Sequence, residues 1–255
     1  MGRRRSALVS VGLALVLLVI IRMSPAPIPL KLNRILAVVR ASSRDGSLRH
    51  VKETYDTIGK FLPSADRLVF TGVKDAKNGT PAVPHSVIGR GKKWYNLVRG
   101  RNIPQYHGDS WDRIEWRTGN CYDFVKITSI IGQDRLAQYD LFLWVEDDVL
   151  LSREFANYLE FRNTERKWDV LVGLHIKAPA DHSYPGGGFL AVAFKPDALR
   201  GFVRLVKKEW TENPIDWILD HLQAEAKIWT VGPVVTHRKL PSTLTGCKHA
   251  SAQCI

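Results

Sequence analysis

The feature that most constrains this chain is a mostly apolar run that ends abruptly in acidic residues. Tyr139–Val145 (YDLFLWV) predicts a buried β-strand. It is followed directly by Glu146, Asp147 and Asp148. Three carboxylates at one strand end repel one another unless a cation or several hydrogen-bond donors compensate their charge. Two interpretations fit the triplet alone: a divalent metal site built from hard oxygen ligands, or a solvated turn that caps the following helix.

Strand and helix patterns alternate along the chain. Arg34–Arg40 and Arg67–Thr71 predict strands, and apolar residues at helical spacing lie between them. This β-α-β beginning favours a parallel sheet. We expect an α/β domain with a mostly parallel central sheet, whose carboxyl edge is where ligands bind in open sheets of this kind. The sequence also predicts helices over residues 117–133, 153–166, 196–210 and 214–226. Further strands are predicted over residues 168–174, 189–194 and 228–235.

The first 23 residues predict a cytosolic stub and a membrane anchor. Residues 7–21 are almost wholly apolar and follow a basic stub, residues 3–5. A cleavable signal peptide begins in the same way, but Pro25 and Pro27 disfavour cleavage after this run, so we expect an uncleaved signal anchor. The positive-inside rule then predicts a single-pass type II membrane protein with its folded domain in the lumen. The apolar run is shorter than the roughly 20 residues of an ordinary span, which suits the thin membranes of the Golgi or the endoplasmic reticulum.

The rest of the chain divides into a short stem (24–33), one folded domain (34–246) and a tail (247–255). Asn78-Gly79-Thr80 matches the acceptor sequence for N-glycosylation, which suits a lumenal domain.

The chain is basic, with a formal net charge of +12. A basic surface suits nucleotide diphosphates, phosphorylated glycans, lipid head groups or nucleic acid, and a lumenal location excludes nucleic acid. A basic and aromatic cluster between residues 90 and 101 is either an anion-binding segment or solvated surface. We expect Cys121 in the core, whereas Cys247 and Cys254 either pair in an oxidising lumen or remain thiols.

A second acidic pair lies on the predicted helix 214–226. Asp216 and Asp220 are four residues apart and therefore share one helix face. A carboxylate in the first turn of a helix is stabilised as the anion and can serve as a general base. The alternative is that Asp216 only caps the helix.

Several stretches stand in an order that points to one family. They are Trp116-Arg117-Thr118 with Asp123, Val145-Glu146-Asp147-Asp148-Val149, Pro214-Ile215-Asp216-Trp217-Ile218-Leu219-Asp220-His221, and His237 before Ser242-Thr243-Leu244. Together they resemble the N-acetylglucosaminyltransferase IV family, which adds a branch to N-glycan cores and has the Rossmann-like GT-A fold.

The resemblance implies metal-dependent, inverting transfer of a sugar, N-acetylglucosamine from UDP-GlcNAc, onto a hydroxyl of a glycan acceptor. It implies that Asp148 and His237 bind the metal, with Mn²⁺ the expected ion and Mg²⁺ the alternative. The base would be Asp216, with Asp220 the second candidate. The nucleotide-sugar donor would contact Arg40, Arg117, Asp123, Glu146 and Asp147.

The acceptor side is less constrained. Gly186, Gly187 and Gly188 resemble the glycine-rich acceptor loop of such enzymes, or form a plain loop. Trp217 would pack against the acceptor sugar, or lie in the core. Two rival functions stay open: a transferase that adds a side branch to glycosylphosphatidylinositol anchors or other glycans from a different donor, and a catalytically silent lumenal glycan-binding protein. The joint presence of Asp148, Asp216 and His237 favours an enzyme.

Overall fold

The computed structural model describes residues 33–41, 49–71, 83–88, 111–160, 168–173, 189–231 and 235–237. The predictions for the anchor, Asn78, the cluster at 90–101, Gly186–Gly188, Cys247 and Cys254 lie outside these residues. Within the described ranges, no helix combines the length and the apolar character needed to cross a membrane.

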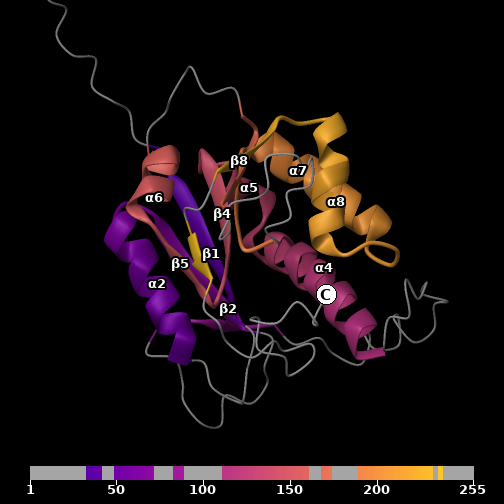
Figure 1. The fold of residues 1–255 in the computed structure, drawn as a ribbon, viewed down its shortest axis with the longest axis horizontal. Helices are drawn as coiled ribbons and strands as arrows, with labels where there is room; N and C mark the ends of the chain where they lie inside the picture. The colour runs from indigo at the N-terminus through magenta and orange to yellow at the C-terminus, as the bar shows by residue number, and fades with distance from the viewer. Residues whose placement is uncertain are drawn as a thin grey trace, which may run out of the picture. The chain divides into compact units, whose positions relative to one another are not determined.

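The described part of the chain builds one seven-stranded sheet in the order β3-β2-β1-β4-β7-β6-β8 (Figure 1). Strand β7 runs antiparallel to both of its neighbours, β4 and β6, and the other neighbouring strands are parallel. This mostly parallel sheet confirms the fold class predicted from the sequence. The strands are β1 (Ile35–Ala41), β2 (Asp66–Thr71), β3 (Ser86–Val87), β4 (Leu141–Glu146), β6 (Val170–Gly173), β7 (Ala191–Phe194) and β8 (Ile228–Val231).

The sheet is covered by helices on both faces, so its central strands are apolar throughout rather than alternating. Every residue of β1 is buried. On one face, side chains such as Val39 and Val145 pack in a core with α2 (Arg49–Phe61) and α6 (Arg153–Glu160). The helices that pack on the opposite face are α4 (Trp111–Ile131), α5 (Gln133–Leu136), α7 (Pro196–Glu209) and α8 (Ile215–His221).

An aromatic cluster fastens α4 and α7 to the second face. Phe124 of α4 lies between Trp144 of β4 and Phe202 of α7, with ring centroids 5.0 and 5.1 Å away. Such contacts contribute about 0.5–1.5 kcal/mol each beyond the burial of their surface. The cluster therefore fixes α4, whose polar face is described below, against the sheet. Cys121, one turn before Phe124, is fully buried as predicted.

The single strand predicted over 228–235 is wrong. The structure divides it into β8, at the edge of the main sheet, and β9 (Val235–His237), which pairs with the short strand β5 (Val149–Leu151). Gly232 and Pro233 stand between the two strands, and proline has no N–H to donate to a ladder. Two helix boundaries also differ. Helix α4 begins at Trp111, and α8 ends at His221, where a 3₁₀ turn, Leu222–Ala224, continues the chain.

Gly173, the last residue of β6, lies where a larger side chain would be crowded. A Cβ atom at this position would lie 3.0 Å from both Phe155 Cε2 and Val235 Cγ1. Both neighbours are stiff, because one is an aromatic ring and the other is β-branched. We expect Gly173→Ala to lower the free energy of unfolding by about 1–3 kcal/mol through overpacking. The measurement is chemical denaturation, with Gly173→Ala repeated in a Val235→Ala background. An equal cost in both backgrounds would contradict the steric explanation.

Candidate active site

The acidic triplet covers the last residue of β4 and the two-residue turn that leads to β5. Asp148 is fully buried and Asp147 is 3% exposed, whereas Glu146 is half-buried at the end of β4. The hydroxyl of Thr54, on α2, donates a hydrogen bond of 2.8 Å to the main-chain carbonyl of Asp147. The turn is therefore tied to α2, and two of its carboxylates are withdrawn from solvent. Burial of this kind requires compensation by donors or by a cation.

Strand pairing brings His237 beside this turn. In the antiparallel pair β5–β9, His237 lies opposite Val149, the residue that follows Asp148. Residues directly opposite in such a pair are about 4.5–5.5 Å apart. The backbone therefore brings the predicted metal ligands Asp148 and His237 together from distant parts of the sequence. The side chain of His237 lies outside the described part of the structure.

The donor set at this turn suits a divalent cation chemically. Carboxylate oxygens are hard ligands, and imidazole is acceptable to Mn²⁺. Among the side chains that the structure describes, no group of three or more His, Cys, Asp or Glu residues is arranged to hold a metal. Asp147 and Asp148 alone do not make a complete site, so a metal centre here needs the side chain of His237 or oxygen atoms of the substrate.

Arg40 and Asp123 form a buried ion pair between β1 and α4. Nε and Nη2 of Arg40 lie 3.1 and 3.0 Å from Oδ2 of Asp123, and both side chains are at most one-tenth exposed. Arg40 is also the register partner of Glu146 on the neighbouring strand β4. Because register partners project from the same face of a sheet, Arg40 stands between the acidic turn and α4. Two residues predicted at the donor site are thus in contact with each other.

Helix α4 also holds the turn that precedes α8. Nη1 of Arg117, a residue that is 3% exposed, donates to the carbonyls of Thr211 and Glu212 at 3.2 and 3.0 Å. One turn along α4, the thiol of Cys121 lies 3.8 Å from the carbonyl of Asn213. Three consecutive carbonyls before α8 therefore accept hydrogen bonds from one helix.

Helix α8 carries the second acidic pair. Asp216 and Asp220 are both half-buried, and Trp217 between them is 39% exposed. Trp217 is therefore a surface residue, contrary to the core alternative. Burial, then the neighbouring Asp216 carboxylate, raise the pKa of Asp220 to about 6, and His221 opposes the shift.

The thiol of Cys121 is influenced by carboxylates of two helices, Asp123 of α4 and Asp216 of α8. Burial is the main cause that raises the pKa of this thiol, followed by the Asp216 carboxylate. Arg117 opposes the shift, and Asp123 adds a smaller rise. The polar residues of α4 and α8 therefore share one electrostatic environment.

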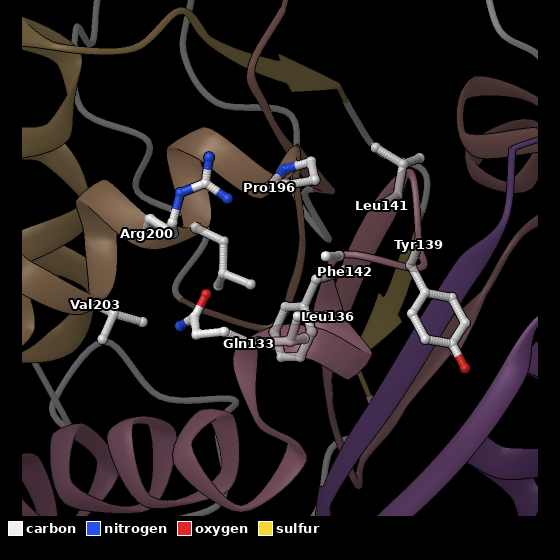
Figure 2. A pocket seen from close by; sticks show the side chains of 10 residues that line it. Gln133, Leu136, Tyr139, Leu141, Phe142, Pro196, Arg200 and Val203 are labelled. Atoms are coloured by element: carbon white, nitrogen blue, oxygen red, sulfur yellow. The ribbon is translucent and has the colours of Figure 1, made fainter.

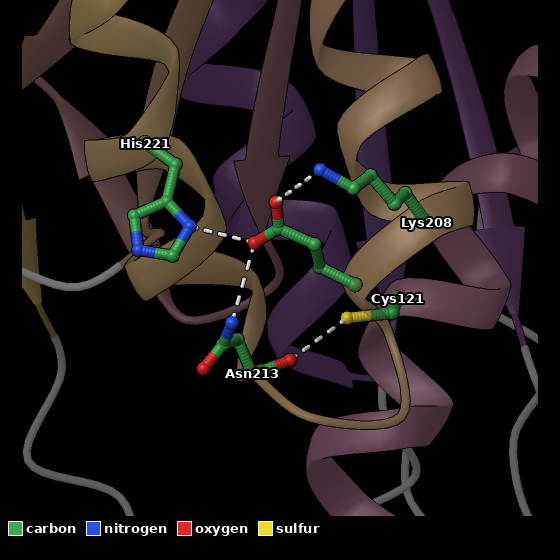
Figure 3. Close-up of polar contacts among 5 residues, drawn as sticks. Cys121, Lys208, Asn213 and His221 are labelled. Carbon is green, nitrogen blue, oxygen red and sulfur yellow. Dashed lines mark hydrogen bonds and ion pairs between the residues drawn. The ribbon is translucent and has the colours of Figure 1, made fainter.

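Sequence reasoning missed Glu209, at the end of α7. Its Oε2 accepts a hydrogen bond of 3.2 Å from Nδ2 of Asn213 and lies 2.6 Å from Nδ1 of His221 (Figure 3). The residue stands at the end of a basic helix, and nothing in its sequence neighbours indicates a partner twelve positions away. Only the fold reveals this contact.

An open pocket lies at the other end of β4. Its walls come from α5, the start of β4 and α7, and they include Gln133, Tyr139, Leu141 and Arg200 (Figure 2). Leu141 begins the strand that Glu146 ends. The two residues are about 17 Å apart along the strand, at 3.3 Å per residue. The pocket is therefore separate from the acidic turn.

Part of the chain is similar to known sugar-transferring enzymes. Over 124 residues, 48% of the chain, it is 24% identical to the alpha-1,3-mannosyl-glycoprotein 4-beta-N-acetylglucosaminyltransferase A of Bos taurus and of Rattus norvegicus. The matched region spans 20% and 21% of these two relatives, which is about a fifth of their length. No family model matches the chain.

Two solved structures show a distant likeness. A glycosyltransferase involved in the glycosylation of the major capsid of PBCV-1 has a TM-score of 0.45 at 9% identity, over 81% of this chain and 94% of its own. The galactosyltransferase LgtC, in complex with donor and acceptor sugar analogs, has a TM-score of 0.38 at 9% identity, over 76% of this chain and 73% of its own. Neither likeness is close enough to support a conclusion about chemistry.

The shifted pKa of Asp220 predicts a pH-dependent difference in stability. Its pKa is about 6 in the folded chain against an ordinary 3.8, so the folded state binds more protons between these values. The contribution of Asp220 to stability is therefore present below about pH 4 and is lost as the pH rises to about 6. We expect Asp220→Asn to gain stability relative to the wild type across this interval and to keep that gain above it.

Urea midpoints measured from pH 4 to pH 8 test this expectation. The control is Asp197→Asn, whose side chain is 90% exposed. A pH-independent difference for Asp220→Asn would contradict the shift.

Proposed function

We propose that this chain is a glycosyltransferase that moves a sugar from a nucleotide-sugar donor to a hydroxyl group of a glycan. The observation that carries the proposal is the buried acidic turn at the carboxyl end of β4, with His237 paired beside it. The carboxyl edge of a mostly parallel sheet is the usual place for a nucleotide ligand. The partial similarity to N-acetylglucosaminyltransferases supports the same reaction class.

A divalent metal fits this turn, and Asp148 and His237 would hold it. A bound metal neutralises the charge that develops on a diphosphate leaving group. On our proposal, Glu146 and Asp147 orient the donor from the turn. On the donor side, the ion pair of Arg40 with Asp123 mainly holds α4 against β1. Arg117 mainly holds the turn before α8.

The acceptor hydroxyl needs a base. We assign this role to a carboxylate of α8, Asp216 first and Asp220 second. The carboxylate takes the hydroxyl proton while the acceptor oxygen bonds to the anomeric carbon, and the bond from that carbon to the diphosphate breaks. A single displacement of this kind inverts the anomeric centre. The raised pKa of Asp220, about 6, makes this carboxylate a stronger base than an ordinary aspartate and leaves it mostly ionised at neutral pH.

The finer assignment follows the similar proteins. Their name describes transfer of N-acetylglucosamine to alpha-1,3-mannosyl glycoproteins. We propose UDP-GlcNAc as the donor, Mn²⁺ as the ion and an N-glycan as the acceptor, in the Golgi lumen behind the predicted anchor. Trp217 is exposed beside the acidic pair and would pack against the acceptor sugar, since aromatic faces suit the apolar face of a sugar ring. Gly186–Gly188 would complete the acceptor side.

Replacement of Asp148 tests the metal. We expect Asp148→Asn to weaken Mn²⁺-dependent binding of UDP more than about tenfold, because loss of even a residue behind the ligands costs about 10–100-fold in metal affinity or activity. Titration calorimetry of UDP with Mn²⁺ or with EDTA measures this. Asp197→Asn, a change of an exposed carboxylate, is the matched control. Unchanged, metal-independent UDP binding in Asp148→Asn would refute the assignment.

Replacement of the α8 acids tests the base. We expect Asp216→Asn to reduce transfer by about 10²–10⁴-fold, the usual contribution of a general base, without weakening UDP binding. The assay is transfer from UDP-GlcNAc to a glycoprotein with terminal alpha-1,3-linked mannose, compared with a panel of other UDP- and GDP-sugars. A larger loss in Asp220→Asn would exchange the two roles. Transfer from another donor would correct the sugar, and no turnover of any donor, together with no metal-dependent binding, would favour the silent glycan-binding protein.

A further inference from the structure

Helix α8 is too short to hold its own orientation. It has seven residues, Ile215–His221, and isolated helices of fewer than about 12–15 residues are marginal in water. Its apolar side is buried through Ile215, Ile218 and Leu219. This packing anchors one face of the helix, whereas Asp216 and Asp220 lie on the half-buried side, where polar contacts at the two ends add a constraint on its tilt.

One carboxylate reaches both ends of this helix. Oε2 of Glu209 accepts from Asn213, two residues before α8, at 3.2 Å, and it contacts His221, the last residue of α8, at 2.6 Å. Figure 3 shows the contacts from Asn213 and His221 meeting at the same oxygen. The Glu209 side chain is only 13% exposed, so water competes weakly for these bonds.

The turn between Glu209 and α8 is held from a second direction. The main-chain N–H groups of Glu212 and Asn213 both bond to the carbonyl of Glu209 at 2.9 Å. Arg117 and Cys121 of α4 contact the carbonyls of the same turn. The start of α8 is thus held by polar contacts from both α4 and α7, and its last residue by the contact between Glu209 and His221.

We propose that Glu209 is a positioning residue for the acceptor-side carboxylates, acting through Asn213 and His221 on the orientation of α8. This inference rests on the proposed function, since it assumes that an acid of α8 takes the acceptor proton. His221 is adjacent to Asp220 in the chain, so a tilt of the last turn moves Asp220 directly. A displacement of about 1 Å of a catalytic group costs about 100-fold in rate.

The experiment compares Glu209→Ala, Glu209→Gln and Glu212→Ala. Alanine removes the acceptor of both contacts, whereas the amide oxygen of glutamine can still accept from Asn213 and from His221. The Glu212 side chain is exposed and lies in the same turn, so its removal is the matched control. We expect Glu209→Ala to lower kcat for transfer by 10- to 100-fold, with KM for UDP-GlcNAc and Mn²⁺-dependent UDP binding unchanged. Glu209→Gln should recover most of the rate, and Glu212→Ala should match the wild type.

A double-mutant cycle distinguishes a loss of positioning from a general loss of folding. His221→Ala should lower kcat, but by no more than Glu209→Ala, which also removes the contact to Asn213. The double variant should be no slower than Glu209→Ala, because the effect of His221 on α8 passes through its contact with Glu209. Thermal unfolding is followed for each variant. Additive losses, equal rates for Glu209→Ala and the wild type, or a parallel loss of UDP binding would overturn the inference. A wild-type chain that transfers no sugar would instead overturn the proposed function.

Discussion

The polar side of the candidate site depends on the buried ion pair between Arg40 and Asp123. A charge taken out of water is costly, and the loss of one partner of a buried pair typically costs about 3–5 kcal/mol because the other charge is left uncompensated. The pair joins the end of β1 to the middle of α4. Together with the aromatic cluster around Phe124, this contact positions α4. Arg117 and Cys121 of the same helix then hold the turn before α8.

The two sets of carboxylates come from different layers of the molecule. The acidic turn is tied to α2, which covers one face of the sheet, through the Thr54 hydroxyl. Asp216 and Asp220 belong to α8, which packs on the opposite face. A ligand that touches both sets must lie across the edge of the sheet. On the proposed function, the diphosphate end of the donor meets the acceptor hydroxyl there. The acidic turn acts on the diphosphate, and the carboxylates of α8 act on the hydroxyl.

Sequence patterns predicted the order of the helices and most strands because apolar periodicity is a local property. They could not predict how 228–235 divides, since Ile228–Val231 and Val235–His237 are both strand-like and only pairing assigns them to different sheets. The charge types at Arg40 and Asp123 were evident, but residues 83 positions apart carry no sign of being partners. Glu209 was missed for the same reason, and the exposure of Trp217 follows from which side of α8 meets the core.

The pairing of β5 with β9 has a consequence for the order in which the chain assembles during synthesis. The acidic turn leaves the ribosome well before Val235–His237, so its final partner strand is missing while most of the domain is already available to fold. Parallel pairs such as β1–β2 and β1–β4 can form early from segments already released. Closure of the turn by β9 comes after these pairs, and a nascent chain that stalls before this strand would have most of its sheet and core but an acidic turn without its partner strand.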